Sequence, residues 1–182
     1  CRFDGQRVTM ASQMSEADET VSSLYSVKSE QATMLSFDTY NYLVHYFGQP
    51  QGSMADDPNG TLGGDYEFVI SDATADRIEL KGKKYGNRIV MKAFSADQTW
   101  KQYLTRIKKV EDDAFFYEYD LRMDGLYTGQ MLRSNYTFIV TYYDEVGKVY
   151  QKTVPFMFTT DGMRFHEPVT IDGQTMQNFV WK

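Results

Sequence analysis

Residues 65–91 read DYEFVISDATADRIELKGKKYGNRIVM and decide the fold class. Apolar and polar side chains alternate over 66–70, again over 78–80 and again over 89–91. A strand with one buried face has this period of two, because successive side chains point to opposite sides of the sheet. Polar or glycine-containing segments separate the three runs, so the stretch predicts a three-stranded antiparallel meander.

The same pattern recurs on both sides of this meander. Further strands are predicted at 7–10, 24–28, 34–37, 115–123, 136–143, 149–158 and 176–181. Four Asp-Gly pairs separate strand-like runs, and this dipeptide favours tight hairpin turns; they are Asp4-Gly5, Asp124-Gly125, Asp161-Gly162 and Asp172-Gly173. Pro155 lies inside one predicted strand and indicates an edge strand or a bulge.

Two segments interrupt the strand pattern. Residues 34–47 begin as a strand, and their aromatic content then favours a hairpin at 39–41. Tyr40, Leu43, Val44 and Phe47 also have the i, i+3, i+4, i+7 spacing of one helical face, which leaves a helix as the alternative. The glycine-rich segment 48–64 follows as the longest loop, a length that is usually functional or disordered.

One amphipathic helix is predicted at about 95–110. Ser95 and Gln98 form a capping-box pattern at its start. Trp100, Leu104 and Ile107 mark its apolar face.

The predicted fold is therefore mainly β, with antiparallel meanders that form a lipocalin-like barrel or two packed β units. The chain is expected to be one β-rich domain over 1–182, or two similar β halves at about 1–93 and 115–182 joined by the helix.

Composition limits the classes of partner. The net charge is −6 and the pI is about 4.9, so the protein lacks the basic surface that neutralises phosphates, and we expect no nucleic-acid partner. The basic residues at 106, 108 and 109 are better explained by the end of the helix, where cations complement the helix dipole. No apolar run approaches the roughly 18 residues that span a membrane.

Tyrosines beside the long loop are the best candidates for ligand binding. Tyr40, Tyr42 and Tyr46 would share one face if their segment were a strand, and exposed aromatic rings can stack on sugar rings. Core packing is the competing use of these tyrosines. Trp100 is the fourth candidate, either as a binding platform or as a core anchor of the helix.

Catalytic and metal motifs are weak. His45 and His166 are the only histidines, and no nucleophile elbow, HExxH motif or phosphate-binding loop occurs. Glu118 and Asp120 are two apart on a predicted strand, the kind of pair that glycosidases use, although a solvated face with Arg122 as charge partner is the simpler interpretation. We therefore expect no catalytic residues and no cofactor.

Calcium is a further possibility in the long loop. Carboxylate and amide oxygens there, the ligand type that calcium prefers, come from Asp56, Asp57, Asn59 and Asp65. Their spacing does not fit the EF-hand template, and a plain acidic turn is the default, so no metal site is expected.

Several ordered motifs resemble one family. They are LSFDTYNYLVHYF at 35–47, GGDYEFVI at 63–70, DRIELKGKKYGNRIVM at 76–91, VPFMFTTDGMRF at 154–165 and FVW at 179–181. Together they resemble a family of Bacteroidetes lipoproteins of unknown function, of the domain-of-unknown-function 4302 type. The resemblance implies secretion to the cell envelope, a lipid anchor at an upstream cysteine, a periplasmic or outer-membrane location and a length beyond 182 residues. It transfers no functional residues. Cys1 is expected to be an ordinary strand residue, because a strand pattern follows it at once.

These observations predict a non-enzymatic envelope lipoprotein that binds a glycan or a surface protein. A lipocalin-like carrier of a small apolar ligand is the alternative, and a glycoside-processing enzyme is the third possibility. The membrane would be reached only through the upstream anchor.

Overall fold

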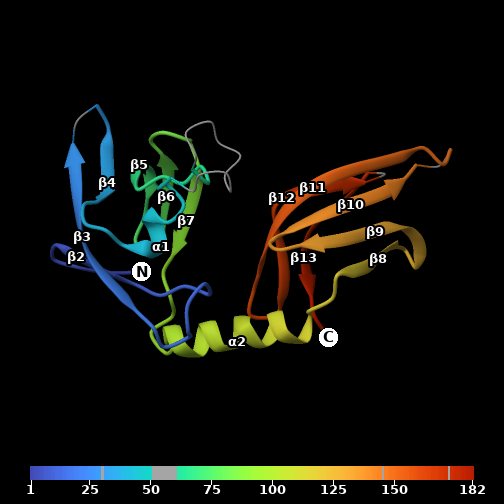
Figure 1. The fold of residues 1–182 in the computed structure, drawn as a ribbon, viewed down its shortest axis with the longest axis horizontal. Helices are drawn as coiled ribbons and strands as arrows, with labels where there is room; N and C mark the ends of the chain where they lie inside the picture. The colour runs from blue at the N-terminus through green and yellow to red at the C-terminus, as the bar shows by residue number, and fades with distance from the viewer. Residues whose placement is uncertain (30, 51–60, 145, 172) are drawn as a thin grey trace. The chain divides into compact units, whose positions relative to one another are not determined.

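The chain folds into two curled antiparallel half-barrel sheets, as seen in a computed structural model (Figure 1). The structure describes residues 1–182 except 30, 51–60, 145 and 172. Strands account for 52% of the chain, which confirms the prediction of a mainly β fold with one amphipathic helix. Of the two arrangements considered, the strands form two separate sheets rather than one barrel.

The first compact unit, Cys1–Lys101, contains a seven-stranded sheet in which each strand pairs with the next one in sequence. Its elements are β1 Arg2–Asp4, β2 Arg7–Met10, β3 Val21–Ser29, β4 Thr33–Phe37, the short helix α1 Tyr42–His45, β5 Glu67–Ala73, β6 Arg77–Gly82 and β7 Arg88–Lys92. The predicted meander is β5–β6–β7, paired antiparallel throughout.

The second compact unit, Gln102–Lys182, contains a six-stranded sheet that is again ordered along the sequence. Its strands are β8 Glu118–Met123, β9 Leu126–Ser134, β10 Thr137–Tyr143, β11 Val149–Phe158, β12 Gly162–Ile171 and β13 Gln174–Val180. Helix α2, Trp100–Asp113, runs into this unit.

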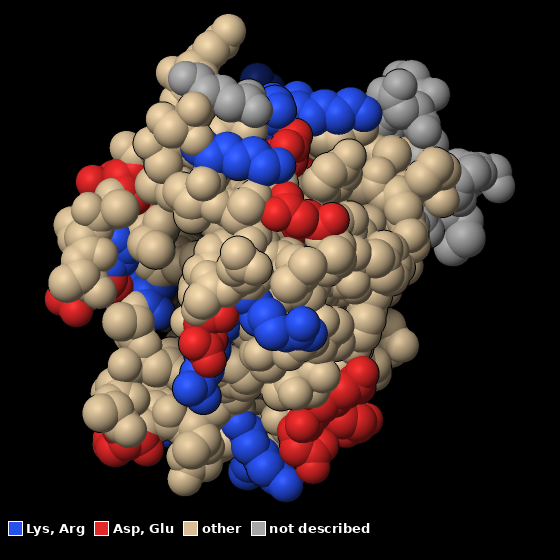
Figure 2. Space-filling model, turned by 90° about the vertical axis from the view of Figure 1, so that its left-hand side faces the viewer, with Lys and Arg blue, Asp and Glu red and all other residues tan. Residues whose placement is uncertain are grey.

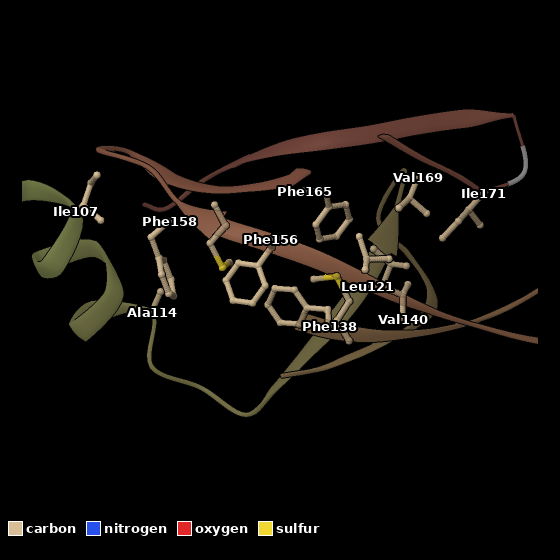
Figure 3. Packing of buried hydrophobic residues seen from close by; sticks show 13 residues of the cluster. Ile107, Ala114, Leu121, Phe138, Val140, Phe156, Phe158, Phe165, Val169 and Ile171 are labelled. Carbon is tan, nitrogen blue, oxygen red and sulfur yellow. The ribbon is translucent and has the colours of Figure 1, made fainter. Parts of the chain in front are cut away.

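Each unit has its own hydrophobic core. In the first unit the buried core cluster consists of Val8, Leu35, Phe37, Phe68 and Leu80, from four different strands. In the second, Phe138 and Phe156 stack with ring centroids 4.3 Å apart, and Phe165 meets Phe138 edge-on at 6.2 Å (Figure 3). Alternate residues of neighbouring strands thus fill the inner face of the second sheet with aromatic rings.

The predicted hairpin at 39–41 is wrong, because helix α1 begins directly after these residues, at Tyr42, in place of a returning strand. Asn41 provides the N-cap: its side-chain oxygen accepts a hydrogen bond from the backbone N–H of Leu43 at 3.1 Å. An asparagine cap satisfies one of the free N–H groups of a first helical turn. The aromatic content of this segment therefore gave the wrong element, and the helical spacing was the better signal.

Helix α2 begins five residues later than predicted. The backbone N–H of Gln98 donates to the carbonyl of Ser95 at 3.0 Å, which closes a separate turn before the helix. The Ser95 side chain hydrogen-bonds to Asp97 and lowers the pKa of that carboxyl, so it does not cap the helix.

Three strand predictions also change. Strand β8 begins at Glu118 rather than at residue 115, and Cys1 lies just before β1 rather than within it. β11 is an inner strand of the sheet, so Pro155 does not mark an edge strand. Its pairing with β12 covers only Phe156–Phe158, so the missing N–H of Pro155 falls where β11 is paired on one side.

Charges of both signs are mixed on the surface. On the face drawn in Figure 2, lysine and arginine lie among aspartate and glutamate, and neither sign forms a continuous patch. Lys83 and Glu67, for example, form an ion pair at 2.9 Å. Within the described residues, no helix combines the length and the apolar character needed to cross a bilayer.

Candidate functional site

Three aromatic side chains form a stacked row on the first unit. The imidazole of His45 lies parallel to the ring of Tyr66, with centroids 5.0 Å apart and an interplanar angle of 15°. The ring of Tyr40 also approaches the imidazole, with centroids 5.5 Å apart and an interplanar angle of 41°. We call Tyr40, His45 and Tyr66 the aromatic row.

Both outer rings of the aromatic row are open to solvent. Tyr40 is 62% exposed and Tyr66 is 46% exposed, whereas His45 between them is half-buried. Large aromatic side chains are usually withdrawn into a core, since each buries a large apolar surface. Two exposed tyrosines aligned through a histidine are therefore free to contact a ligand.

Asn41 fixes the position of the row. Its side chain is fully buried, and its amide nitrogen donates to the hydroxyl of Ser23 at 3.1 Å in addition to the cap described above. The backbone N–H of Asn41 lies 3.1 Å from Nδ1 of His45. The same residue thus joins α1 to β3 and orients the central ring of the row.

Close backbone contacts hold the other end of the row. The carbonyl of Phe47 accepts hydrogen bonds from the N–H of Leu62 at 3.1 Å and of Gly64 at 3.0 Å. A Cβ on Gly48 would lie 2.9 Å from the carbonyl oxygen of Gly64 and 3.4 Å from the ring of Tyr66. Only glycine permits this approach, which brings the segment after α1 against Tyr66.

The chemistry of the row suits a ring with one apolar face. Aromatic faces bury the C–H surface of such a ring, and nearby polar groups bind its hydroxyls. The hydroxyl of Tyr40 and the side-chain oxygen of Gln49 are 3.4 Å apart at one end, and each can bond to a ligand hydroxyl.

Comparison with known proteins places the chain in a family. A family model described as a domain of unknown function, DUF4302, matches residues 1–182. The chain belongs to the DUF4302 family. No curated protein and no solved structure matches this DUF4302 domain.

The four predicted binding residues of the DUF4302 domain have four different surroundings. Tyr40 belongs to the aromatic row. Tyr42 points to the preceding loop, where its hydroxyl donates to Glu19 at 2.8 Å, a bond that raises the pKa of Tyr42. Tyr46 meets Phe47 edge-on at 5.5 Å, and Trp100 lines a separate cavity. The three tyrosines do not share a face, because Tyr42 lies in helix α1 and Tyr46 is its C-cap residue, where a strand was expected.

The calcium candidates lie mostly outside the described residues, which omit Asp56, Asp57 and Asn59. Asp65 is buried, and its carboxylate accepts hydrogen bonds from the N–H of Lys84 at 2.7 Å, the N–H of Tyr85 at 3.2 Å and the amide of Asn87 at 3.2 Å. These donors organise the β6–β7 turn. Gly82 allows this, since a Cβ there would clash with the carboxylate. The expectation of no metal site in this loop stays a prediction.

The candidate acid pair lies on the outer side of β8. Glu118 and Asp120 are both exposed, and Asp120 forms an ion pair with Arg122 at 2.9 Å. His166 is exposed on β12, in the other unit from His45. Among the described residues no group of three or more His, Cys, Asp or Glu could hold a metal ion.

Sequence reasoning missed His45 and Tyr66 as members of the row. Tyr66 was assigned to the buried face with Phe68, but it lies just before β5 and its side chain is exposed. The Gly63-Gly64 pair, separated from it only by Asp65, was the available signal, because glycines next to a strand mark close backbone approach.

Proposed function

We propose that the DUF4302 domain is a non-enzymatic binding module that takes a glycan on the aromatic row. The observation that carries this proposal is the exposed stack of Tyr40, His45 and Tyr66 on a rigid frame. A preorganised platform loses little binding free energy to the ordering of side chains, because few rotamers are restricted when the ligand binds. Tyrosine combines an apolar face with a hydroxyl, which are the two features of a sugar ring.

The filled inner faces make a carrier role less favourable. Phe138, Phe156 and Phe165 occupy the inner side of the second sheet, and Phe37, Phe68 and Leu80 are buried in the first. A lipocalin-like carrier needs this interior space for its apolar ligand. An enzyme would require titratable groups gathered in one cleft, and Glu118 and Asp120 instead face solvent on a strand.

The proposal is tested with a glycan array followed by calorimetry on the best ligand. Tyr66→Ala and Tyr40→Ala are each expected to weaken binding about fivefold, since one aromatic contact contributes roughly 1 kcal/mol. Tyr117→Ala is the matched control, because Tyr117 is 72% exposed in the other unit. Binding that is unchanged by Tyr66→Ala but lost in Tyr117→Ala would contradict the proposal.

A surface protein is the alternative occupant of the row. If the row binds a protein, no glycan on the array should bind. The protein partner should bind equally well after its own glycans are removed enzymatically. The Tyr40→Ala and Tyr66→Ala variants should then weaken capture of that partner, while Tyr117→Ala should not.

We also infer that the protein is a lipoprotein of the cell envelope, anchored through a cysteine upstream of this domain. The resemblance to Bacteroidetes lipoproteins supports this inference. Expression of the complete gene in a Bacteroidetes host, with metabolic labelling by an alkyne fatty acid, should give a labelled protein in the membrane fraction. An unlabelled protein in the cytosol would refute it.

A further inference from the structure

A second concave site lies where the two edges of the first sheet come together. β1 and β7 are the outermost strands of the seven-stranded sheet, yet Arg2 from β1 and Lys92 from β7 line the same cavity. Figure 1 shows the start of the chain beside the end of β7 that leads to α2. The curl of the sheet thus produces a cavity of about 460 Å³ at its seam. This volume is within the range of small-molecule sites.

The charge of this seam cavity is opposite to that of the protein. Arg2 and Lys92 both line it, and in the described part of the chain neither has a carboxylate partner. Several other cations of the unit are paired, such as Lys28 with Asp38 at 3.3 Å. Two uncompensated positive charges in a chain of net charge −6 create a local site for an anion.

Aromatic side chains complete the seam cavity. Phe94 is 42% exposed and Trp100 is half-buried, and both contribute to its lining. Gln98 adds a side-chain amide that can donate and accept hydrogen bonds. Cations beside aromatic faces bind molecules that carry a negative group on a ring.

We propose that the seam cavity binds a small ring compound with a carboxylate, either an acidic sugar or an aryl acid. Arg2 and Lys92 bind the carboxylate, and Phe94 and Trp100 contact the ring. The proposal is independent of the aromatic row, which lacks a lysine or arginine among its members. It also gives Trp100 a role as a ligand platform rather than a core anchor.

Trp100 allows a direct measurement. The 182 residues include two tryptophans, so Trp181→Phe leaves Trp100 as the only one among them. Glucuronate, phenylacetate and neutral glucose are titrated to about 10 mM, which covers weak millimolar sites. We expect a saturable fluorescence change with at least one carboxylate and none with glucose, and the stronger of the two acids identifies the ring type.

Charge variants identify the carboxylate-binding groups. Arg2→Gln and Lys92→Gln are each expected to raise the dissociation constant about tenfold, the typical loss of one charge-assisted bond. Lys152→Gln, an exposed position on β11, removes the same charge elsewhere and should leave the constant within about twofold.

Three results would overturn the proposal. They are no saturable change with either acid, an equal response to glucose, or Arg2→Gln and Lys92→Gln variants that bind as well as Lys152→Gln. If Trp181→Phe does not fold, calorimetry on the unchanged tryptophan background gives the same comparison. Loss of glycan binding at Tyr40 and Tyr66 would leave these outcomes unaffected.

Discussion

Asn41→Ala tests the idea that one buried amide holds the candidate site together. The side chain is 0% exposed, accepts from the N–H of Leu43 at 3.1 Å and donates to the hydroxyl of Ser23 at 3.1 Å. Loss of an N-cap costs about 1 kcal/mol. Leaving a buried hydroxyl without its partner costs about 1–2 kcal/mol more. The free energy of unfolding should therefore fall by about 2–3 kcal/mol.

Asn41→Ser separates the two contributions. Serine is as good an N-cap as asparagine but is too short to replace the bond to Ser23, so this variant should be about 1 kcal/mol more stable than Asn41→Ala. Asn178→Ala is the control for the same substitution at an exposed strand position, and it should change stability by less than about 0.5 kcal/mol.

Urea unfolding followed by fluorescence provides the measurement. In a Trp181→Phe background the signal comes from Trp100, which belongs to the first unit together with Asn41. The reasoning is refuted if Asn41→Ala lies within about 0.5 kcal/mol of its parent, or if Asn41→Ser is as unstable as Asn41→Ala.

Two further predictions concern the core and the dependence of stability on pH. Phe156→Ala removes a ring that is 1% exposed and stacked on Phe138, and calorimetry should show a loss of about 3–5 kcal/mol; a loss below about 1 kcal/mol would mean that the second core is not packed as described. The nearby hydroxyls of Ser26 and Ser36 and the ammonium of Lys28 lower the pKa of Asp38, so this carboxylate stabilises the fold above about pH 4, and the contribution is lost as the pH falls further. Asp38→Asn should therefore reduce the change of the urea midpoint with pH between about pH 5 and 2. A midpoint that depends on pH as in the unchanged protein would argue against this role of Asp38.

The sequence was sufficient for the meander because its signals are local. Each strand of residues 65–91 carries its own period of two, and each turn carries its own polar or glycine residues. The strands β5, β6 and β7 consequently lie where the alternation predicts them. No information from distant parts of the chain was needed.

The element after β4 could not be decided in this way. Aromatic β propensity and helical spacing compete over 39–47, and the cap at Asn41 decides the outcome. That cap is stabilised by Ser23, which is 18 residues away in sequence. Tertiary contacts routinely override weak local preferences.

The candidate sites depend on the same long-range information. Tyr40 was predicted, but its neighbours in the row come from α1 and from the far side of the long loop. Trp100 was predicted without the arginine and lysine that accompany it, because only the curl of the sheet brings β1 and β7 to one cavity. Residue type identified one member of each site, and the fold supplied the others.

The carbonyl of Phe47 has a consequence for how this protein can change during evolution. By accepting from Leu62 and Gly64, it closes the base of the intervening segment within the first unit. Doubling the length of a segment closed in this way adds only about 0.6 kcal/mol to the entropic cost of closing the loop on folding. Insertions between Phe47 and Leu62 are therefore cheap, and the sheet keeps its register. The same position is a suitable place to insert an affinity tag.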